Sequence, residues 1–257
     1  MTSSNQEGRE PMELNGKVAV VTGACGGIGR SIVQALATSG VRLALVDREA
    51  ASLAALCAEL PVEAEGFAMD LADPQAVQAG ASSILQRFGT VDILVNNAGI
   101  LSPDKLDAVT LQHWHALMAV NLDAALLLSQ AFVPGMKAKS WGRLVNISSY
   151  AWKSGGLTAG TAYSVSKTAL VGLTFSLARE LAGSGITANA VAPAYVVSPM
   201  ILDQLTPEAL ERQRKAIPVG RLCQPEEVAH AVSFLVSPLA GFITGEVIDM
   251  NGGMEFG

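Results

Sequence analysis

The amino-acid sequence predicts a single doubly wound α/β domain, built on a parallel sheet of seven strands. Seven short apolar runs recur along the chain with little polar alternation, which is typical of strands buried on both faces of a parallel sheet. Helical stretches of ten or more residues lie between these runs, as in repeated strand–helix units. No linker, composition shift or internal repeat divides the 257 residues, so one domain is expected.

The strand candidates follow one another at a regular pace. They are 17–23, 41–47, 65–70, 92–99, 143–149, 186–193 and 245–253. Residues 1–12 are polar and lack the apolar segment of a secretory signal, so a loose N-terminal tail is expected there. The domain is therefore assigned to residues 13–257.

The helix expected to begin near Tyr163 is apolar almost all round. Its apolar residues are Val165, Leu170, Val171, Leu173, Phe175, Leu177 and Leu181. A helix that is apolar on every side is buried on every side. One side can pack on the sheet, and the other predicts a second subunit and hence a homo-oligomer.

Composition and charge argue against several classes of protein. Half of the residues are hydrophobic and 16% are charged, and the net charge of −6 with no basic run disfavours nucleic acid or an anionic membrane as partner. No apolar run is expected to be long enough to span a bilayer. The three cysteines are far apart, and no cluster has metal-ligand spacing, so we expect a cytoplasmic protein without a metal site.

The first strand candidate runs into the stretch TGACGGIG, which contains Gly23, Gly27 and Gly29. Glycines at these places permit a tight strand-to-helix turn and let backbone N–H groups approach a pyrophosphate. The second strand candidate ends at Asp47, near the offset at which a carboxylate binds a ribose 2′-hydroxyl and repels a 2′-phosphate. NAD is therefore expected as cofactor, and the neighbouring Arg48 is the feature that favours NADP.

Polar side chains also follow the third and fourth strand candidates. Asp70 stands beside Leu71, where it would either flank an adenine ring or cap the following helix. The stretch NNAG (96–99) suits hydrogen bonds between strand ends and contact with the cofactor ribose. Asn121 lies within a predicted helix, where an amide is unfavourable unless it bonds to backbone or water inside the protein.

The stretch YSVSK places Tyr163 and Lys167 four residues apart, on one face of a helix. One interpretation is a core phenol beside a lysine that reaches solvent. The other is a phenol that gives up its proton beside an ammonium that stabilises the phenolate. The spacing by itself is compatible with both.

TGACGGIG, NNAG, Asn121, NISS and YSVSK occur in this order, and with them the chain resembles the short-chain dehydrogenase/reductase family over nearly its whole length. The resemblance implies a Rossmann-type fold and a tetramer. It implies that Tyr163 is the general acid/base and that Lys167 lowers the pKa of this phenol and binds the nicotinamide ribose. Asn121 would hold a water next to Lys167, and a serine of NISS would bind the substrate oxygen.

The cofactor contacts that the resemblance implies are numerous. They are expected from Gly23, Gly27, Ile28, Gly29, Asp47, Asp70, Leu71, Asn97, Tyr163, Lys167, Pro193, Val196 and Ser198. Ser149 matches the catalytic serine of the family best, and Ser148 is the alternative. Ala194 stands where the family has a glycine, which is tolerable if the local φ is negative.

Two further features concern the substrate. Trp152 and Lys153 stand where similar sequences have small residues. Trp152 is expected to narrow the pocket, and Lys153 either attracts an anionic or polar group of the substrate or is solvated. The segment 198–218 resembles the family's mobile lid.

These observations predict an NAD-dependent oxidoreductase that interconverts a small-molecule secondary alcohol and a ketone. A polyol, a sugar, a hydroxy acid or a cyclic alcohol would each fit the motifs. An NADPH-dependent 3-oxoacyl-thioester reductase is the alternative within the family. A non-enzymatic dinucleotide-binding sensor would keep the fold, but the intact pair of Tyr163 and Lys167 disfavours it.

Overall fold

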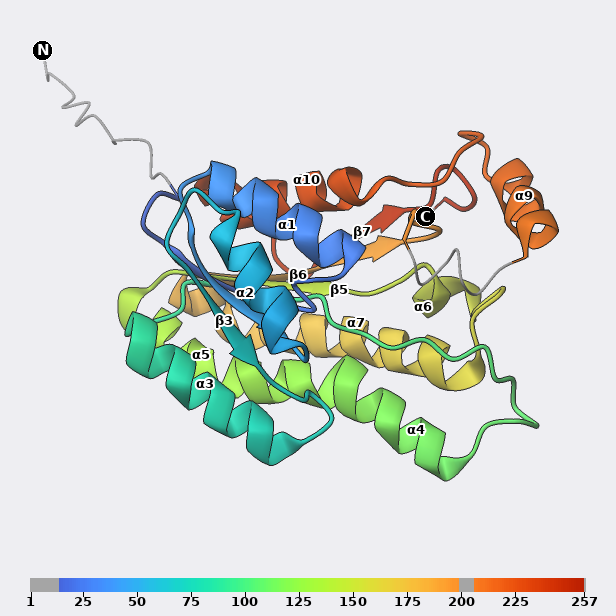
Figure 1. Cartoon of the computed structure of the whole chain (residues 1–257). Helices are drawn as coiled ribbons and strands as arrows, with labels where there is room; N and C mark the ends of the chain where they lie inside the picture. The colour runs from blue at the N-terminus through green and yellow to red at the C-terminus, as the bar shows by residue number, and fades with distance from the viewer. Residues whose placement is uncertain (1–13, 199–205, 257) are drawn as a thin grey trace, which may run out of the picture.

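The protein is described here by a computed structural model that covers residues 14–198 and 206–256. Helices lie on both faces of a seven-stranded parallel sheet (Figure 1). The strand order is β3-β2-β1-β4-β5-β6-β7. The predicted fold class, a Rossmann-type doubly wound sheet, is confirmed, and the tail predicted at 1–12 lies outside the described residues.

Each predicted strand is present in the sheet. The strands are β1 (Val18–Thr22), β2 (Arg42–Asp47), β3 (Ala64–Ala68), β4 (Ile93–Asn96), β5 (Gly142–Ile147), β6 (Ile186–Pro193) and β7 (Val247–Met250). The central strands β1, β4, β5 and β6 are buried at every residue. Burial on both faces explains why their sequences are continuous apolar runs.

Two helical layers cover the sheet. In Figure 1, one layer contains α1 (Gly27–Thr38), α2 (Ala50–Ala58) and α10 (Pro225–Val236), and the other contains α3 (Pro74–Phe88), α5 (Ala124–Lys139) and α7 (Thr161–Leu181). The remaining helices are α4 (Leu111–Met118), η1 (Ala119–Asp123), α6 (Ala151–Ser154), η2 (Ala182–Ser184), α9 (Pro207–Ala216) and η3 (Pro238–Ala240). α4, α6 and α9 lie at the right-hand end of the molecule in Figure 1.

Helix α7 is only partly covered by its own chain. Leu170, Val171 and Leu181 are buried, and they pack on the neighbouring elements. Val165 is 40% exposed and Phe175 is 46% exposed. The single chain therefore buries one side of this apolar helix and leaves the other open.

One continuous helical stretch has the length and composition of a membrane span. It runs over Leu111–Lys139, and 44% of its apolar window is buried inside the protein. The sequence led us to expect no such stretch, and this one qualifies by length and composition only. Core helices of soluble proteins pass the same test, so the feature is weak evidence for a membrane segment.

The strand order creates a switch point beside β1. β1 pairs with β2 on one side and with β4 on the other. In open α/β sheets, ligands bind outside the carboxyl ends of the strands at such a point. The ends of β1, β2, β4, β5 and β6 bring most of the predicted site residues to this edge of the sheet.

Candidate active site

The backbone of the loop after β1 leaves no space for side chains at two of its glycines. Gly23 has a φ of +63°, and a Cβ on it would lie 2.9 Å from the Cα of Ala98. A Cβ on Gly29 would lie 2.0 Å from the carbonyl oxygen of Gly23. Helix α1 has no side-chain cap at Gly26, so its first N–H groups are open to an anion. Gly27 and Ile28 are the first two residues of this helix, and the loop fits a dinucleotide pyrophosphate.

Asp47 lies beside this loop at the end of β2. Its carboxylate accepts hydrogen bonds from the N–H of Cys25 (2.9 Å) and from the N–H of Arg48 (2.8 Å). These bonds hold the negative charge next to the expected ribose position, while the Arg48 side chain is exposed. Asp47 thus lies where the sequence predicts it.

Asp70 and Leu71 follow β3. The carboxylate of Asp70 accepts the N–H of Ala72 (2.9 Å) and closes a turn, and Leu71 is buried. The N-terminal cap of α3 is Asp73, whose carboxylate accepts the N–H of Gln75. Asp70 therefore does not cap this helix, the second of the two roles considered for it.

The two asparagines of NNAG connect neighbouring strands. Asn97 Nδ2 donates to the carbonyls of Thr22 (2.9 Å) and Gly23 (3.1 Å), which ties the end of β4 to the end of β1. Asn96 Nδ2 donates to Asn146 Oδ1 (2.8 Å) on β5. These bonds fix the spacing of the strand ends.

Asn121 lies in η1, a turn of π-helix between α4 and α5. Its Oδ1 accepts the N–H of Ile100 (2.9 Å), and its Nδ2 donates to the carbonyl of Ile100 (3.0 Å) and to Ser166 Oγ (3.0 Å). A π-turn inside a helix frequently marks a functional site. The buried Asn121 amide is hydrogen-bonded mainly to the backbone of Ile100. These bonds explain why an asparagine, which is unfavourable inside a helix, is tolerated at this position.

Lys167 is 3% exposed, and its Nζ donates to the carbonyl of Ile147 (2.8 Å). Burial lowers the pKa of Lys167 from 10.5 to about 8. A Cβ on Gly99 would lie 3.1 Å from Lys167 Nζ and 3.4 Å from Asn121 Oδ1, so both polar atoms border the same small residue. The interpretation of Lys167 as a lysine that reaches solvent is excluded.

Tyr163 lies one helical turn before Lys167, whose Nζ is 5.8 Å from the centre of the tyrosine ring. The Tyr163 and Ser149 side chains line the same cavity, which is described below. Burial raises the pKa of Tyr163, and the nearby Ser149 hydroxyl acts in the opposite direction. A phenol of this kind needs a nearby positive charge to ionise near neutral pH.

The adjacent serines at the end of β5 point to different partners, as alternation along a strand requires. Ser148 is buried, and its Oγ donates to the carbonyl of Lys167 (2.9 Å) in α7. Ser149 Oγ lies beside Tyr163 and also accepts the N–H of Ala151 (3.2 Å). Of the two, only Ser149 lines the cavity described below.

The segment after β6 has no residue in the left-handed region. Among the described residues, Ser140 is the only non-glycine with positive φ, so Ala194 replaces the glycine of the family without strain. Pro193 accepts the N–H of Tyr150 (2.9 Å), and Val196 pairs with Cys223 in an isolated bridge. Ser198 is the last described residue of this segment, and residues 199–205 of the predicted lid lie outside the described part.

Trp152 and Lys153 do not line the cavity. Trp152 Nε1 donates to Asp249 Oδ1 (3.2 Å), and Lys153 Nζ donates to Asp249 Oδ2 (3.3 Å). Asp249 belongs to β7, so these contacts fasten α6 to the edge strand. Neither side chain is thus in the described lining of the cavity, and a role of Trp152 in narrowing the pocket or of Lys153 in attracting substrate stays a prediction.

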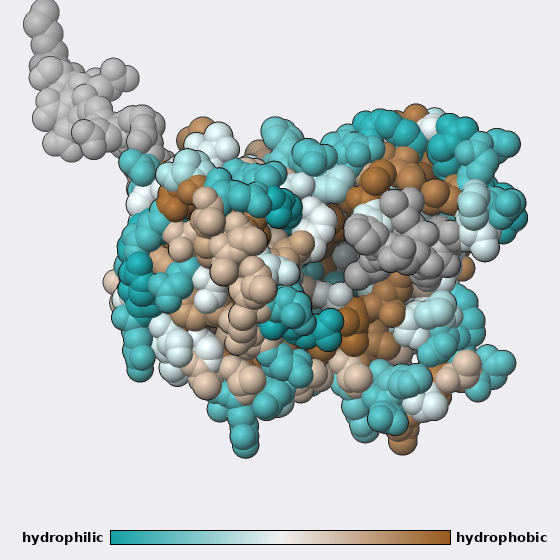
Figure 2. All heavy atoms as spheres, viewed as in Figure 1, coloured by the Kyte–Doolittle hydropathy of each residue, from teal (hydrophilic) through white to brown (hydrophobic). Residues whose placement is uncertain are grey.

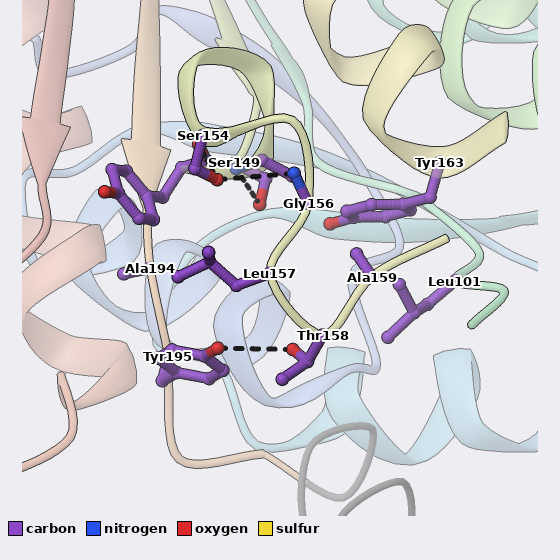
Figure 3. A pocket seen from close by; sticks show the side chains of 12 residues that line it. Leu101, Ser149, Ser154, Gly156, Leu157, Thr158, Ala159, Tyr163, Ala194 and Tyr195 are labelled. Carbon is purple, nitrogen blue, oxygen red and sulfur yellow. Dashed lines mark hydrogen bonds between the residues drawn. The ribbon is translucent and has the colours of Figure 1, made fainter. Parts of the chain in front are cut away.

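A cavity opens at Ser149 and Tyr163 (Figure 3). It is lined by Leu101, Ser149, Tyr150, Ala151, Ser154, Gly156, Leu157, Thr158, Ala159, Tyr163, Ala194 and Tyr195. Figure 2 shows apolar surface at this end of the molecule, between the positions of α9 and α4. The sequence analysis did not identify Tyr150, Thr158 and Tyr195 as site residues. With Tyr163, all three tyrosines of the chain line this cavity.

The described residues contain no group of three or more His, Cys, Asp or Glu side chains that could hold a metal ion. The arrangement instead suits a dinucleotide. The glycine loop and Gly99 lack side chains that would fill the space, and Asp47 holds a carboxylate beside the loop. Ser149, Tyr163 and Lys167 then offer hydroxyl groups and a cation beside an open cavity.

A family model described as enoyl-(acyl carrier protein) reductase matches residues 23–255. The 3-oxoacyl-(acyl-carrier-protein) reductase of Vibrio cholerae is 39% identical over 95% of this chain and 99% of its own. The D-threitol dehydrogenase of Mycolicibacterium smegmatis is 38% identical over 93% of both chains.

Solved structures agree in fold with this chain. One is described as an NAD(P)-dependent gluconate 5-dehydrogenase from Beutenbergia cavernae with bound NADP, at a TM-score of 0.88 and 37% identity over 95% of this chain and 99% of that one. The other is a 3-ketoacyl-(acyl-carrier-protein) reductase from Brucella melitensis with NADH, at a TM-score of 0.88 and 31% identity over 95% and 100%. The similarity extends over nearly the whole of each chain.

Proposed function

The chain belongs to the short-chain dehydrogenase/reductase family, and we propose that it transfers a hydride between NAD(H) and a secondary alcohol or ketone. It is an oxidoreductase that acts on CH–OH groups with a nicotinamide dinucleotide. The observation that carries the proposal is that Tyr163 and Ser149 line one cavity, with the buried ammonium of Lys167 5.8 Å from the centre of the tyrosine ring.

Ser149, Tyr163 and Lys167 have separate roles in the proposed reaction. The bound nicotinamide supplies or accepts the hydride. Ser149 holds the substrate oxygen by a hydrogen bond, and Tyr163 takes its proton during oxidation or returns it during reduction. Lys167 is mostly protonated at neutral pH because its pKa is about 8, and its charge stabilises the Tyr163 phenolate. Asn121 borders Gly99 together with Lys167 and is proposed to hold a water for proton exchange.

We propose NAD as the preferred cofactor because the Asp47 carboxylate is fixed beside the glycine loop. We expect NAD to raise the Tm of the purified protein and NADP to raise it much less. Binding contributes about 2.7 kcal/mol at a hundredfold excess over Kd, which a thermal melt detects. The variant Asp47→Asn keeps the side-chain shape and removes the charge, so the difference between the two cofactors should shrink. A rise of Tm with NADP alone would contradict the proposal.

Reduction of 3-oxoacyl thioesters is the second candidate, because the relatives from Vibrio cholerae and Brucella melitensis carry that description. Assays of acetoacetyl-CoA with NADH and with NADPH, beside an alcohol panel with NAD, separate the candidates. Faster turnover of the thioester than of any alcohol would move this candidate to first place.

We also propose a homotetramer. Phe175 and Val165 leave one apolar surface open on α7, and Leu239 and Phe242, which are 96% and 101% exposed, form another near η3. We expect these exposed apolar side chains on two different elements to serve subunit contacts, since exposed apolar patches mark protein interfaces.

The substitution Phe175→Glu is expected to lower the molar mass in solution, because a charge replaces an apolar side chain at a subunit contact. Size-exclusion chromatography with light scattering measures this mass. Leu106→Glu is the matched control, since Leu106 is 82% exposed and lies in the loop between β4 and α4, outside α7 itself. A monomeric wild-type protein, or an unchanged mass in Phe175→Glu, would count against this interface.

A cytoplasmic location is proposed as well. Cys25, Cys57 and Cys223 are all free thiols in the structure. Free cysteines are typical of a reducing compartment.

A further inference from the structure

The cavity at Tyr163 is rich in hydroxyl groups and carries no charge from the described residues. Six of its lining residues have hydroxyl side chains: Ser149, Tyr150, Ser154, Thr158, Tyr163 and Tyr195. Neither a cationic nor an acidic side chain belongs to the described lining. A carboxylate or phosphate on the substrate would lose its hydration there without gaining a counter-charge. The lining therefore favours a neutral substrate.

The hydroxyl groups of the cavity have different partners. Ser149 and Tyr163 line the proposed reacting position, and Ser149 Oγ accepts the N–H of Ala151 (3.2 Å). Tyr150 Oη donates to the Glu255 carboxylate (2.9 Å), and Ser154 Oγ donates to the carbonyl of Tyr150 (3.0 Å). Tyr195 is left with a hydroxyl group that a substrate can reach.

Tyr195 is bonded to Thr158 across an Oη–Oγ1 distance of 3.3 Å (Figure 3). This is long for a bond between hydroxyl groups, which usually lies near 2.7–2.8 Å. Tyr195 is 7% exposed, so solvent does little to satisfy its hydroxyl. A hydroxyl group of a ligand that bonded Tyr195 would satisfy it better than the long bond does.

The segment that carries Thr158 is held in place. Lys105 Nζ donates to the carbonyls of Gly156 (2.8 Å) and Ala159 (2.6 Å), on both sides of Thr158. Gly156 has a φ of +85°, and a Cβ on it would lie 2.1 Å from Ser164 Oγ. The backbone therefore presents Thr158 to Tyr195 in a fixed geometry before any ligand binds, which favours selective recognition.

We infer that Tyr195 and Thr158 bind a second hydroxyl of a neutral, polyhydroxylated substrate, whose first hydroxyl lies at Ser149 and Tyr163. The inference rests on the proposed function and narrows it to diols, polyols and their hydroxyketones. Leu101, Leu157 and Ala159 also line the cavity, and they suit the carbon chain between the two hydroxyl groups (Figure 3).

The test compares kcat/KM with NAD for butane-2,3-diol and for butan-2-ol, which differ by one hydroxyl group. The wild-type enzyme should prefer the diol by about tenfold or more, since a site built to bond a hydroxyl rejects the analogue without it. Tyr195→Phe and Thr158→Val should each remove most of this preference, chiefly by lowering kcat/KM for the diol. Tyr150→Phe is the matched control, because its hydroxyl is bonded to Glu255, and the preference should persist in it.

Equal use of the two alcohols by the wild-type enzyme would overturn the inference and leave the proposed function intact. The same follows if Tyr195→Phe keeps the preference, or if 3-hydroxybutanoate is oxidised better than the diol. Absence of NAD-linked turnover with every alcohol would instead contradict the proposed function. Thermal melts of the NADH complex with each alcohol then decide the inference: stabilisation by the diol that Tyr195→Phe abolishes supports it, and no stabilisation overturns it.

Discussion

Tyr163→Phe is expected to lower kcat/KM for any alcohol substrate by roughly 100- to 10,000-fold, the range that a positioned general acid/base contributes. The substitution removes one oxygen atom and keeps the ring, so the packing of α7 around it is preserved. The substrate oxygen then has Ser149 as a hydrogen-bond partner and no group that can take its proton. Steady-state assays that follow NADH formation measure the effect.

The variant should still bind cofactor. Its thermal melt should shift with NAD as much as that of the wild-type protein, because the glycine loop and Asp47 are untouched. Loss of the shift together with activity would mean that the variant is misfolded or that the Tyr163 hydroxyl acts mainly in cofactor binding. Activity within tenfold of the wild type would exclude Tyr163 as the general acid/base.

Lys167→Met is expected to abolish most of the activity and to raise the stability of the cofactor-free protein. Activity falls because the Tyr163 phenolate loses the nearby cation. Stability rises because burial lowers the pKa of Lys167 from 10.5 to about 8, which corresponds to about 3 kcal/mol of unfavourable free energy for the buried charge. The lost hydrogen bond to the Ile147 carbonyl offsets about 1 kcal/mol of that gain.

The stability difference should depend on pH in one direction. Below the folded pKa of about 8, Lys167 is charged in both the folded and the unfolded chain, and its full cost is present. As the pH rises from about 8 toward 10.5, the folded chain loses the proton first, so the unfolded chain binds more protons and wild-type stability rises. The advantage of Lys167→Met should therefore be largest near neutral pH and shrink through this window.

Chemical denaturation of both proteins at neutral and at alkaline pH measures this advantage. Lys137→Met is the matched control, since Lys137 is a surface residue paired with Glu180 (3.6 Å), and an exposed ion pair contributes little. It should change neither activity nor stability appreciably. A less stable Lys167→Met at neutral pH would show that the ammonium stabilises the apo fold, contrary to the burial argument.

Much of the fold could be predicted because its signals are local. A strand buried on both faces must be apolar along most of its length, so the central strands β1, β4, β5 and β6 were visible as runs. The glycine loop was visible for a similar reason, since Gly23 has a positive φ and a Cβ on Gly29 would meet the carbonyl oxygen of Gly23 in the same turn. The four-residue spacing of Tyr163 and Lys167 places them one helical turn apart, and this holds whatever the helix packs against.

Contacts between residues of different helices and strands were decided by tertiary packing. Ser148 and Ser149 are neighbours in sequence, and only the position of α7 shows which of them meets the Tyr163 hydroxyl. Asn121 is satisfied by Ile100, which is 21 residues away, through a π-turn that no periodicity indicates.

The sequence by itself determined the doubly wound sheet, the dinucleotide loop and the Tyr163–Lys167 pair, because these depend on backbone periodicity and on steric limits within one element. The tertiary structure alone decided which side chains line the cavity. It turned Trp152 and Lys153 toward Asp249, 97 and 96 residues further along the chain, and it brought Tyr195 beside Thr158, 37 residues apart. Contacts of this range depend on how helices and loops pack on the sheet, and the sequence pattern within one element does not contain that information.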